Sequence, residues 1–263
     1  MNRSSAHLAK VLVPPLVFGA LFFGIWQLAV NIFDIKPYFL VRPTEIFDRF
    51  TTNWDNIRKA MDVTGTNALV GLVCGAVLGV AMSFVLLRFR VLDEIVTPLS
   101  IALNAIPIFV LVAVFNNMFA ITSEVPRRLM VTLVVYFVVL VNVARGLRQV
   151  DATHVELMRS YAASDWAILR KVRVPNAVPY FFTALKIAAP GAVITAFVSE
   201  YFGGSQNGLG NKITSNMSTS KKAEGLAYVA GACLLGLAFY LISIIMELIA
   251  TPGGTRERAE ERA

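Results

Sequence analysis

The sequence predicts an all-α protein that crosses a membrane about six times. Of its 263 residues, 56% are hydrophobic and only 16% are charged, whereas soluble domains carry roughly a quarter charged residues. The hydrophobic residues gather into blocks close to the roughly 20 residues that a helix needs to cross a bilayer. These blocks lack β-barrel alternation, so helices must satisfy the backbone polar groups. The predicted spans are residues 11–33, 66–87, 95–118, 129–147, 178–200 and 226–250.

The two ends of the chain are predicted to lie on the cytoplasmic side. The basic segment 1–10 and the run 11–33 are similar to a signal peptide, but the run is too long and no cleavage motif closes it, so we interpret it as an uncleaved first span. An even number of spans puts both ends on one side. Basic residues are slightly more numerous in the segments on that side, and several lie close to span ends, which favours cytoplasmic termini in a multi-pass cell (inner or plasma) membrane protein. The tail 251–263 alternates Arg and Glu and is predicted to be a disordered cytoplasmic segment.

The composition also limits the kinds of partner and ligand that we expect this chain to bind. The net charge of +7 suggests nucleic acid at first sight, but no basic face carries interleaved stacking residues, so we expect no nucleic-acid partner. Basic residues beside membrane spans instead meet anionic lipid headgroups. Cys74 and Cys233 are isolated within apolar blocks, and the two histidines have no ligand-spaced neighbours, so we expect no metal site.

Glycines recur every four residues in the second predicted span. Gly71, Gly75 and Gly79 form two overlapping G-x-x-x-G patterns. Such a stripe makes a flat groove that lets another helix approach closely. A pore lining is the alternative, and helix packing is the favoured interpretation.

Prolines and polar residues inside the apolar blocks suggest a translocation path. Pro107 in the third span and Pro190 in the fifth remove backbone hydrogen bonds, and such breaks in membranes often line a cavity. Asn104 and Thr195 lie at similar depths, where a polar group is costly unless it is paired or faces water. We predict Asn104, Pro107 and Thr195 as path residues. Interhelical hydrogen bonding is the alternative for the polar pair.

Two charged residues lie within the fifth span or at its end. Lys186 is the one charge that we place deep in a span, with its ammonium group reaching toward the inner face. Glu200 ends the span at the outer face and leads into a glycine-rich loop. We include Glu200 among the path candidates as a gate residue, and simple hydration at the surface is the alternative.

A polar, basic segment of unusual length separates the fourth and fifth spans. Thr153 and Glu156 have capping-box spacing, which predicts a helix from 153 to about Tyr161. Ser164 favours a second helix start, and Pro175 with Pro179 should break that helix beyond Val172. Two short helices joined by a bend at 162–164 are therefore expected. A docking surface for a soluble partner is the favoured interpretation, and a loop bound to anionic lipid is the alternative. The side chains offered for contact are Glu156, Leu157, Arg159, Tyr161 and Trp166.

This segment resembles the cytoplasmic coupling motif of permease subunits of ATP-binding-cassette importers. That motif begins Glu-Ala-Ala, has a glycine three residues later, continues Ala-Ser and ends in proline. Glu156, Ala163, Ser164 and Pro175 stand in the matching places. Leu157 and Met158 replace two alanines of the motif. Ala162 replaces the glycine, and alanine costs roughly 1 kcal/mol or more in the left-handed conformation that glycine allows.

The resemblance extends over residues 40–250 and implies a fold, a role and partners. It implies a type I importer permease with a coupling helix at 153–172, and a cytoplasmic ATPase dimer that carries ATP and Mg²⁺. It also implies an extracytoplasmic substrate-binding protein and a second permease copy or paralogue. The surrounding residues are most similar to the branch for nitrate, sulfonate, taurine, pyrimidine or vitamin precursors.

The chain itself is not expected to be an enzyme. It lacks the Gly-x-x-x-x-Gly-Lys-Ser/Thr loop that wraps the phosphates of ATP, and no catalytic cluster or cofactor site is visible. An ion-coupled secondary transporter is the alternative function. That class should have inverted repeats and several charges deep in the spans.

Overall fold

The computed structural model describes residues 3–119, 123–203 and 207–250. Every regular element within these ranges is helical, as the composition predicts. Five of the helical stretches are long and apolar enough to cross a membrane. The predicted disordered tail 251–263 lies outside the described residues. The elements are α1 (Arg3–Ile32), α2 (Pro43–Thr52), α3 (Trp54–Arg88), α4 (Arg90–Asn104), α5 (Ile108–Met118), α6 (Val125–Arg148), α7 (Ala152–Ser160), α8 (Asp165–Ile168), the π-helical turn η1 (Leu169–Arg173), α9 (Val174–Phe202), α10 (Leu209–Ser218) and α11 (Lys222–Ala250).

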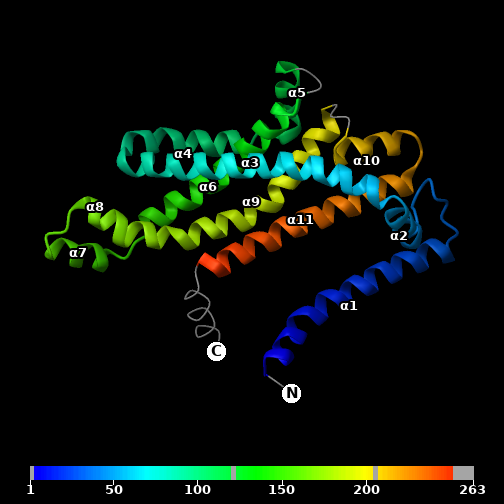
Figure 1. Ribbon diagram of the computed structural model, residues 1–263, viewed down its shortest axis with the longest axis horizontal. Coiled ribbons are helices and arrows are strands. Elements are labelled where there is room, and N and C mark those ends of the chain that lie inside the picture. The colour runs from blue at the N-terminus through cyan, green and yellow to red at the C-terminus, as the bar shows by residue number, and fades with distance from the viewer. Residues whose placement is uncertain (1–2, 120–122, 204–206, 251–263) are drawn as a thin grey trace.

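The predicted third span, 95–118, is divided into two helices. α4 runs back alongside α3 and ends at Asn104, and α5 begins at Ile108 (Figure 1). Pro107 precedes α5 with an extended backbone, φ −57° and ψ 128°. Proline lacks an amide hydrogen and disfavours a helical conformation in the preceding residue, which accounts for the interruption here. Neither piece is long enough to count among the five spanning stretches.

Other prolines leave their helices unbroken, which corrects two expectations. Pro190 lies inside α9 and does not interrupt it. Pro175 and Pro179 do not end the second short helix either, because α8, η1 and α9 form one continuous stretch, Asp165–Phe202, of 38 residues. Pro175 lies in the first turn of α9, directly after η1. The wider π-helical turn directly before it carries the chain across this position.

The glycine stripe of α3 lies against α6. A Cβ atom built on Gly75 would be 2.6 Å from the carbonyl oxygen of Thr132, and one built on Gly79 would be 2.9 Å from that of Tyr136. Gly71 faces Val131 in the same way. The two backbones are therefore in direct contact, as expected of small residues at a membrane helix interface.

The remaining spans are arranged around this pair. α9 packs against both α6 and α3, and α11 packs against α9. α1 stands apart from the bundle and contacts α2 at one end (Figure 1). The hairpin of α7 and α8 projects from one end of the bundle, whereas α2 and α10 lie at the other end.

A second deep charge corrects the interpretation of Lys186. The Nζ atom of Lys186 in α9 lies 2.7 Å from Oε2 of Glu247 in α11, and both side chains are largely buried. Glu247 falls within the sixth predicted span, so Lys186 is not the one deep charge. Pairing removes the cost of an isolated buried ammonium group and joins α11 to α9.

The α3–α6 contact yields a first prediction. The variant Gly75→Ala should lower the free energy of unfolding by about 1–3 kcal/mol, because the added methyl group meets a backbone carbonyl that cannot move aside. The apparent melting temperature in detergent measures this. The control is Gly236→Ala in α11, where an added Cβ has open space. A Gly75→Ala variant as stable as this control would contradict the close contact.

Candidate functional site

The α7 helix begins one residue earlier than the capping box predicted. Its N-cap is Asp151, whose carboxylate accepts a hydrogen bond of 2.8 Å from the backbone amide of Thr153. Thr153 and Glu156 therefore do not form the expected capping box. The Thr153 amide also lowers the pKa of the Asp151 carboxyl group. An ionised cap suits this position because the helix dipole favours negative charge at an N-terminus.

The bend between α7 and α8 is left-handed at Ala162. Its φ angle is 55°, the conformation that the missing glycine would have adopted without strain. The amide of Ala162 donates to the carbonyl of Arg159, and the amide of Ala163 donates to the carbonyl of Met158. This pair of hydrogen bonds is the Schellman motif that commonly ends a helix. The motif outweighs the cost of alanine in this conformation, so the strain is tolerated.

The second helix of the hairpin begins as predicted. The Ser164 hydroxyl oxygen accepts a hydrogen bond of 3.3 Å from the amide of Ala167, which confirms Ser164 as an N-cap. Ala163 is half-buried, and Ser164 and Ala162 are exposed. The bend at 162–164 therefore holds two short helices at a fixed angle while leaving their outer faces open.

Large apolar side chains protrude from this hairpin. Leu157 is 54% exposed, Tyr161 78% and Trp166 69%. Glu156 and Arg159 are exposed beside them. Apolar groups next to charged groups at a helical tip are typical of a surface that a protein partner covers. Pro175 is exposed but lies beyond η1, on the first turn of α9.

The base of the hairpin is clamped to the end of α6. Arg173 Nη1 donates to the carbonyl of Leu147 at 3.0 Å, and Asn176 Nδ2 donates to the carbonyls of Gly146 at 2.7 Å and Gln149 at 3.0 Å. These contacts satisfy carbonyls that the helix end leaves without partners. Sequence reasoning missed Asn176, whose signal is a lone amide between two prolines.

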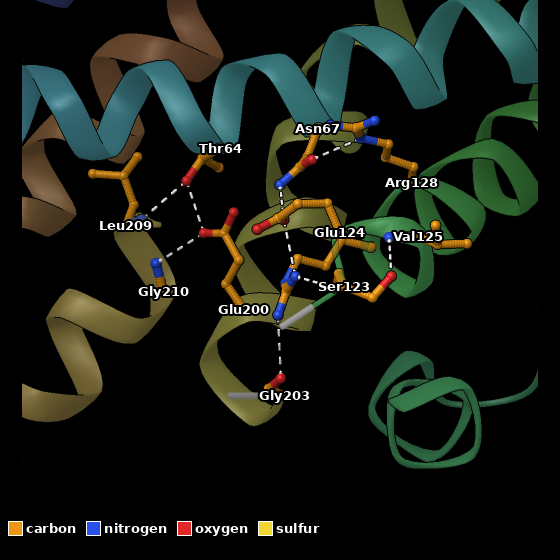
Figure 2. Close-up of polar contacts among 11 residues, drawn as sticks. Thr64, Asn67, Ser123, Glu124, Val125, Arg128, Glu200, Gly203, Leu209 and Gly210 are labelled. Carbon is orange, nitrogen blue, oxygen red and sulfur yellow. Dashed lines mark hydrogen bonds and ion pairs between the residues drawn. The ribbon is translucent and has the colours of Figure 1, made fainter. Parts of the chain in front are cut away.

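A buried carboxylate joins three elements at the other end of the bundle. Glu200 in α9 is fully buried, and its Oε2 atom accepts hydrogen bonds from the Thr64 hydroxyl at 2.7 Å and the Gly210 amide at 3.2 Å. The Thr64 oxygen also accepts the amide of Leu209 at 2.9 Å. Figure 2 shows the carboxylate between α3 and the first turn of α10. This placement supplies a hydrogen-bond acceptor to the first turn of α10, whose amides have no partner within the helix.

An arginine network lies next to this carboxylate. Arg127 is 1% exposed, and its Nη1 atom lies 2.9 Å from Oε2 of Glu124. Asn67 of α3 donates to the same Glu124 oxygen at 2.7 Å and accepts from Arg128 Nε at 3.1 Å (Figure 2). Sequence reasoning found none of these partners except Glu200. The only signal for them was the pair Thr64 and Asn67, three residues apart in the first half of α3.

The predicted path residues are not gathered on one surface of this chain. Thr195 is 2% exposed and Glu200 is fully buried, both on α9. Pro107 is exposed at the start of α5. The side chain of Asn104 lies outside the described residues, although its backbone ends α4.

Residues 71–251 match a protein family described as the inner membrane component of binding-protein-dependent transport systems. This chain belongs to that family. The matched region contains the glycine stripe, the α7–α8 hairpin and all of α9–α11. The chain is accordingly a multi-pass inner-membrane permease of an ATP-binding-cassette importer, and a separate subunit hydrolyses ATP.

Named relatives agree with this membership. A probable ABC transporter permease protein of Haemophilus influenzae is 28% identical over 76% of this chain and 81% of the relative. The formylaminopyrimidine transport permease protein ThiX of Halalkalibacterium halodurans is 30% identical over 74% and 78%. The riboflavin transport system permease protein RibX of Chloroflexus aurantiacus is 25% identical over 84% and 83%. The importer class implies ATPase and binding-protein partners in general.

The buried carboxylate of the permease yields a second prediction. Thr64→Val keeps the side-chain shape but leaves the Leu209 amide without its acceptor and removes a donor to Glu200. Each buried polar group left without a partner costs about 1–3 kcal/mol, so the apparent melting temperature in detergent should fall clearly. The control is Thr66→Val, because that exposed hydroxyl bonds only within its own helix. Equal stability of the two variants would contradict a stabilising role for the hydrogen bonds of Thr64 with Glu200 and Leu209.

Proposed function

We propose that this permease couples to its ATPase through the 152–168 hairpin. The observation that carries the proposal is the exposed apolar group Leu157, Tyr161 and Trp166 on a hairpin that projects beyond the bundle (Figure 1). The ATPase dimer holds ATP and Mg²⁺, and this chain supplies no nucleotide site. Closure of the ATPase pair pushes the hairpin, and the clamp of Arg173 and Asn176 passes the force to α6 and α9.

The orientation of the permease is part of the same proposal. The hairpin, the α3–α4 turn and the end of α11 share one end of the bundle (Figure 1), and we assign this end and both termini to the cytosol. The opposite end, with α2 and α10, receives solute from the binding protein. A second permease copy or a paralogue completes the path. Modification of a Ser160→Cys variant in intact cells by a membrane-impermeant thiol reagent would contradict this orientation.

We propose a nitrogen heterocycle as the solute, of the pyrimidine or vitamin-precursor kind. The relatives ThiX and RibX are named as permease proteins for the transport of formylaminopyrimidine and riboflavin. The pairing of three cationic side chains in the described helices also disfavours a small anion as their ligand. Arg127, Arg128 and Lys186 are bonded to Glu124, Asn67 and Glu247 respectively, so protein groups already occupy them. The same pairing gives no support to an ion-coupled carrier.

Charge reversal on the hairpin tests the coupling. Glu156→Lys should reduce co-purification of the ATPase and solute uptake at least about tenfold, because a reversed charge at a docking surface costs several kcal/mol. The control is Asp48→Lys, which makes the same charge change on an exposed residue of α2, at the far end of the bundle. This control should retain the ATPase. Full ATPase binding and uptake in the Glu156→Lys variant would contradict the proposal.

Uptake by the assembled importer tests which class of solute the permease transports. Vesicles that hold the permease, its ATPase and its binding protein should accumulate labelled formylaminopyrimidine or riboflavin when ATP is present. Taurine and nitrate should not compete at equal concentration. Accumulation of taurine or nitrate instead would contradict the assigned solute class while leaving the coupling intact.

A further inference from the structure

A cleft of about 910 Å³ lies behind the hairpin, between it and the end of α3. α3 contributes Phe84, Leu87 and Arg88, and α7 contributes Val155 and Arg159. The rest of the lining comes from α8, η1 and the first residue of α9. Hairpin and bundle therefore form the two walls, and whatever occupies the cleft touches both.

Positive charge dominates this lining. Four guanidinium groups face one carboxylate, that of Asp165. Arg173 is engaged at the end of α6, and Arg88 lies 5.7 Å from the ring centroid of Phe89. Within the described part of the chain, Arg159 and Arg170 form no ion pair. The cleft thus offers an anionic group several unsatisfied donors, and guanidinium groups bind phosphate oxygens well.

Apolar side chains line the same cleft. The lining residues beside the arginines include Phe84, Leu87, Trp166, Ile168 and Leu169. The apolar α3 helix ends here at Arg88, which puts the arginines at the level where a spanning helix leaves the hydrocarbon. Tryptophan and arginine at that level are typical of the membrane interface. A ligand that suits both parts of the lining has a phosphate and a hydrocarbon chain.

We propose that this cleft binds an anionic phospholipid, with its phosphate on Arg88 and Arg170 and an acyl chain along Phe84 and Leu87. The inference goes beyond the proposed coupling, because the cleft lies between the hairpin and α3, and Leu157 and Tyr161 of the docking surface do not line it. Glu156 is also outside the lining, whereas Arg159 and Trp166 line the cleft and are shared by the two surfaces. The bound lipid fills the space behind the hairpin and holds it at a fixed distance from α3.

Lipid retention by the purified permease tests the site. Native mass spectrometry should show phosphatidylglycerol retained in preference to phosphatidylcholine, and Arg88→Gln with Arg170→Gln should lower that preference on the order of tenfold. The matched control is Arg145→Gln with Lys171→Gln. It removes two exposed charges at the same end of the bundle, and neither residue lines the cleft.

Each outcome decides between the possible occupants. Equal lipid retention in the two double variants would overturn the proposal. Displacement of the lipid by millimolar inorganic phosphate would also overturn it, because that result would indicate a binding site for free phosphate. Loss of ATPase co-purification with unchanged lipid retention would also overturn it and assign the arginines to the protein partner. Because retention is measured on the permease alone, failure of the coupling proposal leaves this result interpretable.

Discussion

The structure depends on direct backbone contact between α6 and its neighbours. Lipid chains are as apolar as leucine, so membrane helices gain little from burying apolar area and rely on close packing. The glycines of α3 supply that packing on one side of α6. Near the end of α6, Gly146 contacts the ring of Tyr180 and the backbone of Ala177 in α9. α6 is thereby packed closely against two spans, and it leads directly into the hairpin.

This arrangement explains how a small surface hairpin can act on the whole bundle. A loop joined to α6 only through the chain would bend freely at residues 149–151. Arg173 and Asn176 prevent that by binding the last carbonyls of α6, and η1 continues the second helix of the hairpin into α9 without interruption. A force on the hairpin is therefore carried by α6 and α9 together. At the far end, Glu200 ties the same α9 helix to α3 and α10.

Short sequence motifs predicted those features of the structure that depend on residues close together in the chain. The glycine stripe, the hairpin and the Ser164 cap depend on neighbouring residues, and each could be inferred from the sequence. The fate of each proline could not, because it depends on distant packing. Pro190 stays helical where Ala188, Ala189, Ala192 and Val193 are buried around it, whereas exposed Pro107 interrupts its helix. The Lys186–Glu247 pair and the arginine network join residues about 60 positions apart, and one sequence gives no signal of such pairs.

The central claim is that the hairpin is the surface that the ATPase moves. Cysteine cross-linking in the assembled importer tests this most directly, using Tyr161→Cys after both native cysteines, Cys74 and Cys233, are replaced by serine. The account predicts a cross-link from position 161 to the ATPase whose yield changes when ATP binds. A position 161 that reacts only with lipid-soluble reagents, and forms no ATPase adduct with or without ATP, would contradict it.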